Sequence, residues 1–188
     1  MYSGHLLSSD SYENYFFYWL HPRPDSLADG DNTDSPLIVY LNGGPGSTSM
    51  NALFTGNGPL RVTETGSSKQ GEDFEITYDT TISWAAAGDL LWIDQPVGTG
   101  WSYGEHMVTT LDEIGDEFLQ FMLSFYEEYP IYKERQLVLT GESFAGKYLS
   151  YSSRAILDYN DSQDEFKFDL RNLMLSNPLV DTPTERLN

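Results

Sequence analysis

The residues best suited to covalent chemistry lie in one short segment, Gly-Glu-Ser-Phe-Ala-Gly at 141–146. It contains a Gly-x-Ser-x-Gly match after an apolar run and before a stretch compatible with a helix from about Ala145 to Leu157. This setting is typical of a nucleophile elbow, where a serine sits in a tight turn between strand and helix. A glycine-rich turn without chemistry is the alternative. The strand-turn-helix context favours Ser143 as a nucleophile.

A second glycine-rich segment, Asn-Gly-Gly-Pro-Gly-Ser at 42–47, follows another apolar run. Glycines there would let a backbone amide point into a cleft, which suits one half of an oxyanion hole. The other half would be the amide of Phe144, the residue after the nucleophile, so that side chain's identity should not matter. A tight loop or a phosphate cradle is the alternative. Because the segment lacks both the Walker ending and Gly-x-Gly-x-x-Gly, we do not expect nucleotide binding.

Two further segments carry weaker signals. Asp94–Tyr103 follows an apolar run and, taken alone, predicts only a turn. The polar stretch 29–34 (Asp-Gly-Asp-Asn-Thr-Asp) starts like a calcium loop, but Tyr40 stands where the bidentate glutamate belongs. We therefore expect no metal site and no cofactor.

Short apolar runs without polar alternation must position these segments. Such runs are typical of strands that are buried on both faces. Three are clear, at Leu37–Leu41, Leu90–Ile93 and Gln136–Leu139, whereas Leu173–Leu175 is weaker and the aromatic run Tyr15–Leu20 predicts an earlier strand. The first three end in turns at what would be the carboxyl edge of a parallel sheet, where open α/β sheets place their sites.

A crossover helix is predicted between the second and third runs. Apolar residues recur there at helical spacing, and Thr110 with Glu113 forms a capping box. The stripe consists of Leu111, Ile114, Phe118, Met122, Phe125 and Tyr129, which we interpret as core packing. The acidic residues Asp112, Glu113, Asp116 and Glu117 suit the helix N-terminus, and a solvated face explains them equally well.

Composition narrows the classes of partner. The chain has 188 residues, a net charge of -19 and a pI near 4.1, so nucleic acid and anionic membranes would be repelled. It contains no cysteine, and redox compartment therefore cannot be read from the sequence. It shows neither a secretory signal nor an apolar run of membrane-spanning length. Its length fits one domain or a large part of one.

Taken together, the segments resemble the serine carboxypeptidase family of α/β-hydrolases over nearly the whole chain. The pair of Asn-Gly-Gly-Pro-Gly and Gly-Glu-Ser-x-Ala-Gly is highly specific. The similar segments are Tyr2–Gly4, Tyr18–Trp19, Asn42–Ser47, Ser83–Trp84, Asp94–Tyr103, Gly141–Tyr148 and Ser176–Pro178. The resemblance implies an α/β fold with a mostly parallel sheet and flanking helices. We expect residues 1–188 to form the N-terminal part of a single such domain, incomplete at its C-terminal side.

The resemblance also implies roles for individual residues. It implies hydrolysis of C-terminal peptide bonds through an acyl-enzyme on Ser143, with oxyanion amides from Gly44 and Phe144. The substrate would be a peptide with a free C-terminus, whose carboxylate Asn42, Gly43 and Glu142 would help to hold. Two carboxylates cannot share a site unless one carries a proton, so Glu142 should act in acid. A buried acid with a local backbone donor is the alternative for Glu142.

The sequence departs from the family's catalytic pattern because no histidine follows Ser143. In α/β-hydrolases the order is Ser, then Asp or Glu, then His, and a serine without an imidazole is a poor nucleophile. His5, His21 and His106 all lie upstream, and we interpret each as a surface or loop residue. We expect this chain alone to be inactive. The missing Asp and His would come from downstream sequence or from a second chain, and the isolated piece should expose an apolar edge.

Other departures concern the substrate site. Tyr40 stands where the family usually has Trp, Gly56 stands where it has a Glu that partners Glu142, and Ser47 replaces a common Cys. Loss of that Glu could weaken recognition of a free C-terminus. A carboxypeptidase-like acyltransferase and a non-catalytic binding protein are therefore the alternative functions. By resemblance, we expect a location in the secretory pathway, the lysosome or vacuole, or outside the cell.

Overall fold

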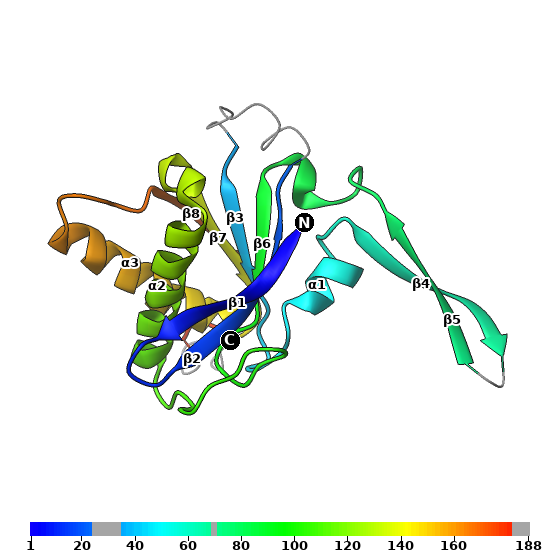
Figure 1. The fold of residues 1–188 in the computed structure, drawn as a ribbon, viewed down its shortest axis with the longest axis horizontal. Coiled ribbons are helices and arrows are strands. Elements are labelled where there is room, and N and C mark those ends of the chain that lie inside the picture. Colours follow the sequence, from blue (N-terminus) through cyan, green and yellow to red (C-terminus); the bar gives the residue numbers. More distant parts are fainter. Residues whose placement is uncertain (24–34, 69–70, 182–188) are drawn as a thin grey trace.

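The computed structural model describes residues 1–23, 35–68 and 71–181 (Figure 1). They form a six-stranded sheet with the order β1-β2-β6-β3-β7-β8 and a separate hairpin of β4 and β5. The strands are β1 (Tyr2–Ser9), β2 (Asn14–His21), β3 (Leu37–Leu41), β4 (Leu60–Ser68), β5 (Gly71–Tyr78), β6 (Asp89–Ile93), β7 (Leu137–Glu142) and β8 (Leu170–Ser176). The helices are α1 (Met50–Thr55), α2 (Leu111–Glu128) and α3 (Ala145–Ser162), with single 3₁₀ turns η1 (Trp84–Ala86) and η2 (Pro130–Glu134).

The sheet is mostly parallel, as predicted. Strands β6, β3, β7 and β8 run parallel to one another, whereas β1 and β2 are antiparallel at one edge. The three apolar runs form the central strands β3, β6 and β7, and their side chains are almost completely buried. All three strands therefore deliver their following loops to one edge of the sheet.

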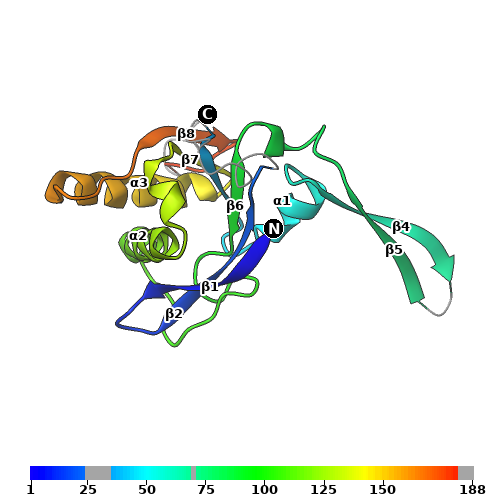
Figure 2. The same ribbon diagram turned by 45° about the horizontal axis from the view of Figure 1, so that its top comes forward.

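Helices α2 and α3 pack together over one face of the sheet, and α1 lies over the other face (Figure 2). The predicted capping box begins α2: the Glu113 amide donates to Thr110 Oγ1, and the Thr110 amide donates to Glu113 Oε2. The predicted apolar stripe of α2 faces the core. The helix after Ser143 extends to Ser162, five residues beyond the predicted end.

One acidic residue of α2 does not fit the solvated-face interpretation. Glu117 is only 5% exposed, and its Oε1 atom accepts a 2.6 Å hydrogen bond from Asn14 Nδ2. Its position, seven residues after the N-cap, places it on the core side of the helix. Burial raises its pKa, and the Asn14 donor only partly offsets this effect.

Among the residues that the structure describes, strand β8 forms the second edge of the sheet and pairs with β7 alone. Leu173 and Met174 on this strand are 41% and 55% exposed, in agreement with the apolar edge expected from the sequence. The β4–β5 hairpin extends away from the sheet (Figures 1 and 2). No helix in the part of the chain that the structure describes is long and apolar enough to cross a membrane.

Candidate functional site

Ser143 lies in the turn between β7 and α3 with a φ angle of +58°, a left-handed conformation that is rare for residues with a side chain. Close approaches on both sides require the flanking glycines. A Cβ atom on Gly141 would lie 2.7 Å from the carbonyl oxygen of Leu41, and one on Gly146 would lie 2.9 Å from that of Leu179. The local strand-turn-helix arrangement therefore agrees with the predicted elbow.

Backbone hydrogen bonds tie the elbow to the segment that follows β8. The Ser143 amide donates to the carbonyl oxygen of Ser176 at 3.1 Å, and the Leu179 amide donates to that of Ser143 at 2.8 Å. The Ser143 side chain is half-buried. Within the described residues, Ser143 Oγ has no hydrogen-bond partner, so its hydroxyl is not committed to a structural contact.

The three histidines lie in other environments. The ring of His5 contacts the carbonyl oxygen of Trp101, and the ring of His106 stacks on Tyr12. His21 is 3% exposed, and its Nε2 lies 2.8 Å from the hydroxyl of Tyr78. The interpretation of His21 as a surface or loop residue is therefore wrong, because it ends a strand whose final side chains are buried. Burial lowers its pKa.

The glycine-rich loop after β3 lies directly against the elbow. A Cβ atom on Gly43 would lie 2.6 Å from the backbone nitrogen of Phe144 and 2.7 Å from the carbonyl oxygen of Glu142. Gly44 adopts a φ angle of +112°, which favours glycine. Among the residues that the structure describes, the amides of Gly44 and Phe144 donate no hydrogen bond. The sheet thus brings together the two segments that the sequence singled out.

Asp94 fixes this loop from the neighbouring strand, a role that was not predicted from the sequence. Its Oδ1 atom accepts from Thr48 Oγ1 at 2.6 Å and from the Ser49 amide at 2.8 Å, and its Oδ2 accepts from the Trp101 amide at 3.1 Å. Burial raises the pKa of Asp94 despite these donors. The sequence feature that could have indicated this role is an Asp that directly follows a buried strand and precedes a proline and two glycines.

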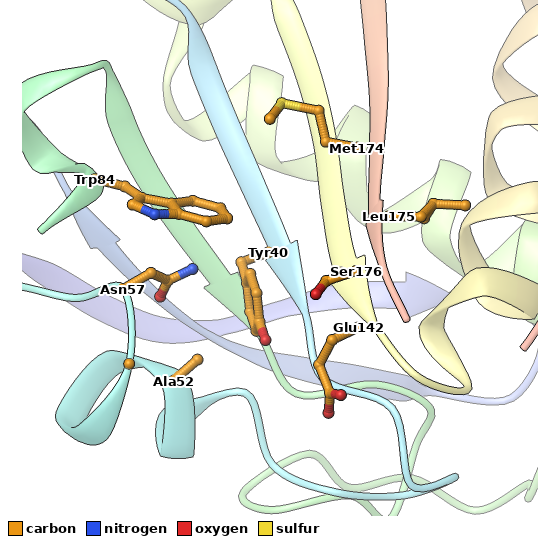
Figure 3. Close-up of a pocket in the computed structure, with 10 residues that line it drawn as sticks. Tyr40, Ala52, Asn57, Trp84, Glu142, Met174, Leu175 and Ser176 are labelled. Carbon is orange, nitrogen blue, oxygen red and sulfur yellow. The ribbon is translucent and has the colours of Figure 1, made fainter. Parts of the chain in front are cut away.

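A pocket of about 410 Å³ opens beside the elbow (Figure 3). Tyr40 and Glu142, two predicted substrate-site residues, line it together with Trp84. The Tyr40 hydroxyl donates to Asn42 Oδ1 at 3.4 Å. Burial and the negative charge of Glu142 raise the pKa of Tyr40 to about 12, so this hydroxyl is a neutral donor. The other lining residues are Ala52, Gly56, Asn57, Gly141, Met174, Leu175 and Ser176.

Several lining residues, among them Asn57, Trp84 and Met174, were not predicted as site residues. Each comes from a segment outside the two motifs, and the fold alone brings them to Tyr40 and Glu142. Residues 29–34, which start like a calcium loop, lie outside the described residues. Within residues 1–23, 35–68 and 71–181, no group of three or more His, Cys, Asp or Glu side chains could hold a metal ion.

A serine in a strained turn at the carboxyl edge of a mostly parallel sheet, with a glycine loop packed beside it, defines a protein of the α/β-hydrolase class. Comparison of the sequence with family models gives a match to "Serine carboxypeptidase" over residues 1–187. The chain belongs to the serine carboxypeptidase family.

Curated relatives agree with this assignment. The chain is 33% identical to the pheromone-processing carboxypeptidase KEX1 of Candida glabrata, over 100% of this chain and 25% of that protein. It is 37% identical to the KEX1 protein of Paracoccidioides lutzii, over 94% of this chain and 26% of that protein. It thus spans about a quarter of the length of these relatives.

A solved structure confirms the fold. The crystal structure of KEX1(delta)P, a prohormone-processing carboxypeptidase from Saccharomyces cerevisiae, superposes with a TM-score of 0.85 and 32% identity. The match covers 99% of this chain and 40% of that one. The predicted α/β-hydrolase-type architecture is therefore confirmed.

Proposed function

We propose that this chain is the nucleophile-bearing part of a serine carboxypeptidase, which removes the C-terminal residue of peptides through an acyl-enzyme on Ser143. One observation carries the proposal: Ser143 has a strained backbone conformation at the elbow, its hydroxyl has no hydrogen-bond partner among the described residues, and the loop that contains Gly43 packs directly against it. Donors held in advance around a nucleophile stabilise the charge that develops in acyl transfer. The family assignment supports the choice of a peptide as substrate.

In the proposed reaction, Ser143 Oγ attacks the carbonyl carbon of the last peptide bond. An imidazole takes the hydroxyl proton and passes it to the leaving amine, the C–N bond breaks, and the C-terminal amino acid departs. Water then hydrolyses the ester on Ser143 and regenerates the hydroxyl. The amides of Gly44 and Phe144 would hold the oxyanion in both steps. The imidazole and its aspartate would come from outside these 188 residues or from a second chain.

The terminal carboxylate of the substrate would bind next to the elbow, at Asn42, Gly43 and Glu142, with Tyr40 alongside. The hydrogen bond from Tyr40 to Asn42 supports this placement, because Asn42 Oδ1 is then an acceptor and its amide NH₂ remains free to face an anion. The proposed role of Glu142 requires a proton between the two carboxyl groups. We therefore expect binding of a free C-terminus to strengthen as the pH falls.

A serine-directed phosphonate probe tests the proposal in the natural-length protein. Labelling of Ser143 that is lost in Ser143→Ala supports a catalytic serine, and absence of labelling from the wild-type protein contradicts it and favours a binding protein. Release of the C-terminal residue from blocked dipeptides is then compared with acyl transfer to an alcohol. Faster transfer than hydrolysis would favour the acyltransferase alternative.

The location in the secretory pathway, the lysosome or vacuole, or outside the cell is part of the same proposal. The family assignment supports it, and self-repulsion of a chain with a net charge of -19 would lessen in an acidic compartment. Fractionation of cells that express the natural-length protein tests it. Recovery in the cytosolic fraction would contradict it.

A further inference from the structure

Under the proposed function, the pocket beside the elbow recognises the terminal carboxylate of a peptide. Within the part of the chain that the structure describes, none of its lining residues is Lys, Arg or His, and Glu142 contributes an acidic group. Gly56 lines the pocket but has no side chain. The next residue, Asn57, also lines the pocket and does have a polar side chain. A carboxylate in such a pocket can be held only by neutral hydrogen-bond donors.

The orientation of the Asn57 amide follows from its partner. Trp92 is completely buried, and its Nε1–H lies 2.9 Å from Asn57 Oδ1. An indole N–H can only donate, so the atom that faces it must be the amide oxygen. The other atom of the amide group is then the NH₂ donor, and Figure 3 shows it pointing toward Tyr40. Within the described residues, this NH₂ group has no hydrogen-bond partner.

The backbone also holds Asn57 in place. The Asn57 carbonyl accepts a 2.9 Å hydrogen bond from the Trp84 amide, and the residue is only 9% exposed. The adjoining turn is clamped by Arg61, whose guanidinium donates to the carbonyl oxygens of Gly56 and Gly58. A donor that has a fixed direction, lines a pocket and has no partner among the described residues is a preorganised group for a ligand.

We propose that Asn57 is a specificity-determining residue that donates a hydrogen bond from its NH₂ group to the terminal carboxylate of the substrate. The inference rests on the proposed function for the identity of the ligand as a peptide C-terminus. An amide donor needs no bound proton, in contrast to Glu142. Asn57 therefore supports carboxylate binding at neutral pH, where an acid alone would repel the ligand.

The substitution Asn57→Asp isolates this donor. Aspartate has the same shape and still accepts from Trp92, but it replaces the pocket-facing NH₂ by an oxygen that cannot donate when ionised. The probes are N-acetylphenylalanine and N-acetylphenylalanine amide, titrated calorimetrically into the natural-length protein. The aromatic side chain suits a pocket lined by Tyr40, Trp84 and Met174. Asn51→Asp is the matched control, since Asn51 is exposed on α1 and gains the same charge.

At neutral pH, Asn57→Asp should weaken binding of the acid by about tenfold or more, the usual value of a hydrogen bond to a charged group. Binding of the amide should stay within about twofold of the wild-type value, as should both probes in Asn51→Asp. At acid pH the variant carboxyl group regains a proton and a donor, so binding of the acid should recover. A misfolded variant would not recover.

An unchanged affinity for the acid, or an equal loss for acid and amide, would overturn the inference. The proposed function fails separately, through absence of phosphonate labelling at Ser143 in the wild-type protein. A wild-type protein that is labelled at Ser143 but shows no dependence on Asn57 would therefore refute this inference alone. Binding that depends on Asn57 without labelling would refute catalysis alone.

Discussion

Gly43 and Phe144 are packed so closely that a Cβ atom on Gly43 would lie 2.6 Å from the Phe144 backbone nitrogen. A methyl group there would occupy the space in front of the amide that is proposed to hold the oxyanion. We predict that Gly43→Ala lowers kcat by about 10²–10³-fold, the usual cost of losing one oxyanion donor. Steady-state kinetics on blocked dipeptides with the natural-length protein would measure this loss.

Two substitutions control for that experiment. Gly4→Ala adds a methyl group at an ordinary contact distance of 3.5 Å from the Tyr18 ring and should leave kcat unchanged. Phe144→Ala keeps the backbone amide and removes only a ring that packs on Tyr148, so kcat should fall by less than about threefold. A wild-type kcat in Gly43→Ala would contradict the proposed role of the Phe144 amide in the oxyanion hole.

The second prediction concerns the acid that is missing at position 56. Gly56 has φ and ψ angles of -121° and -105°, a combination outside the main allowed regions, and an added Cβ would lie 3.2 Å from the carbonyl oxygen of Ala52, so a side chain here requires a small local adjustment of the backbone. Gly56→Glu would place a second carboxyl group in the pocket with Glu142. The pair could share a proton at acid pH and bind a carboxylate. We expect kcat/KM for blocked dipeptides to rise several-fold in acid.

The same variant should gain nothing at neutral pH, because two ionised carboxylates would then repel the substrate. Measurement of kcat/KM across the pH range therefore separates recognition from a general effect on folding. The double variant Gly56→Glu, Glu142→Gln supplies the control, since it contains only one acid. A rate unaffected by Gly56→Glu at every pH would contradict the proposed role of the acid pair.

The central sheet and the elbow could be predicted from the sequence because their signals are local. Strands buried on both faces are continuous apolar runs, and a capping box marks the start of a helix within four residues. Strand β1, the β4–β5 hairpin and α1 were not predicted. The strands among them alternate polar and apolar residues, and α1 is short, so contacts with the rest of the fold decide their structure. The five extra residues of α3 continue a helix beyond its last strongly apolar position.

The pocket could be predicted only in part, for a different reason. Tyr40 and Glu142 lie in or next to the motifs, but Asn57 and Trp84 reach the pocket from two other segments. Their placement depends on long-range contacts, such as the hydrogen bond from Trp92 to Asn57 across 35 positions. No spacing rule in a single sequence encodes such a contact. The burial of His21 and Glu117 escaped prediction for the same reason.

The third prediction concerns the pH dependence of stability. Burial raises the pKa of Glu117, so the folded protein binds this proton more tightly than the unfolded chain does. The contribution of this bound proton to the free energy of unfolding is complete below the ordinary pKa of Glu. It is lost as the pH rises through the elevated pKa of Glu117 in the folded protein. We predict that Glu117→Gln, which keeps an acceptor for Asn14, is more stable than the wild type at neutral pH by about 1 kcal/mol.

Urea unfolding at acid and neutral pH measures this difference. Glu117→Gln should match the wild type in acid, where the native carboxyl group is already neutral. The exposed Glu127 on the same helix provides the control, and Glu127→Gln should leave the free energy of unfolding unchanged at both pH values. Equal stabilisation by Glu117→Gln at both pH values would show that charge burial is not the cause.

The fourth prediction concerns an ion pair at the amino end of β6, away from the carboxyl edge that carries Ser143. Asp89 and Arg135 are 0% and 1% exposed, and Arg135 Nη1 lies 2.6 Å from Asp89 Oδ2. Tyr132 donates to the same oxygen, and the Arg23 amide donates to Oδ1. Removing the carboxylate takes away the negative charge that faces the buried guanidinium, so Asp89→Asn should cost about 3–5 kcal/mol in the free energy of unfolding.

The double variant Asp89→Leu, Arg135→Met replaces both charges by apolar groups and should be more stable than Asp89→Asn, because no unpaired charge remains. Urea unfolding gives both values. Below the unfolding transition, phosphonate labelling of Ser143 in the natural-length protein should proceed at the wild-type rate in each variant, since the pair lies at the opposite end of the strands. A loss of less than about 1 kcal/mol in Asp89→Asn would mean that water or other acceptors satisfy the buried Arg135 guanidinium without the carboxylate.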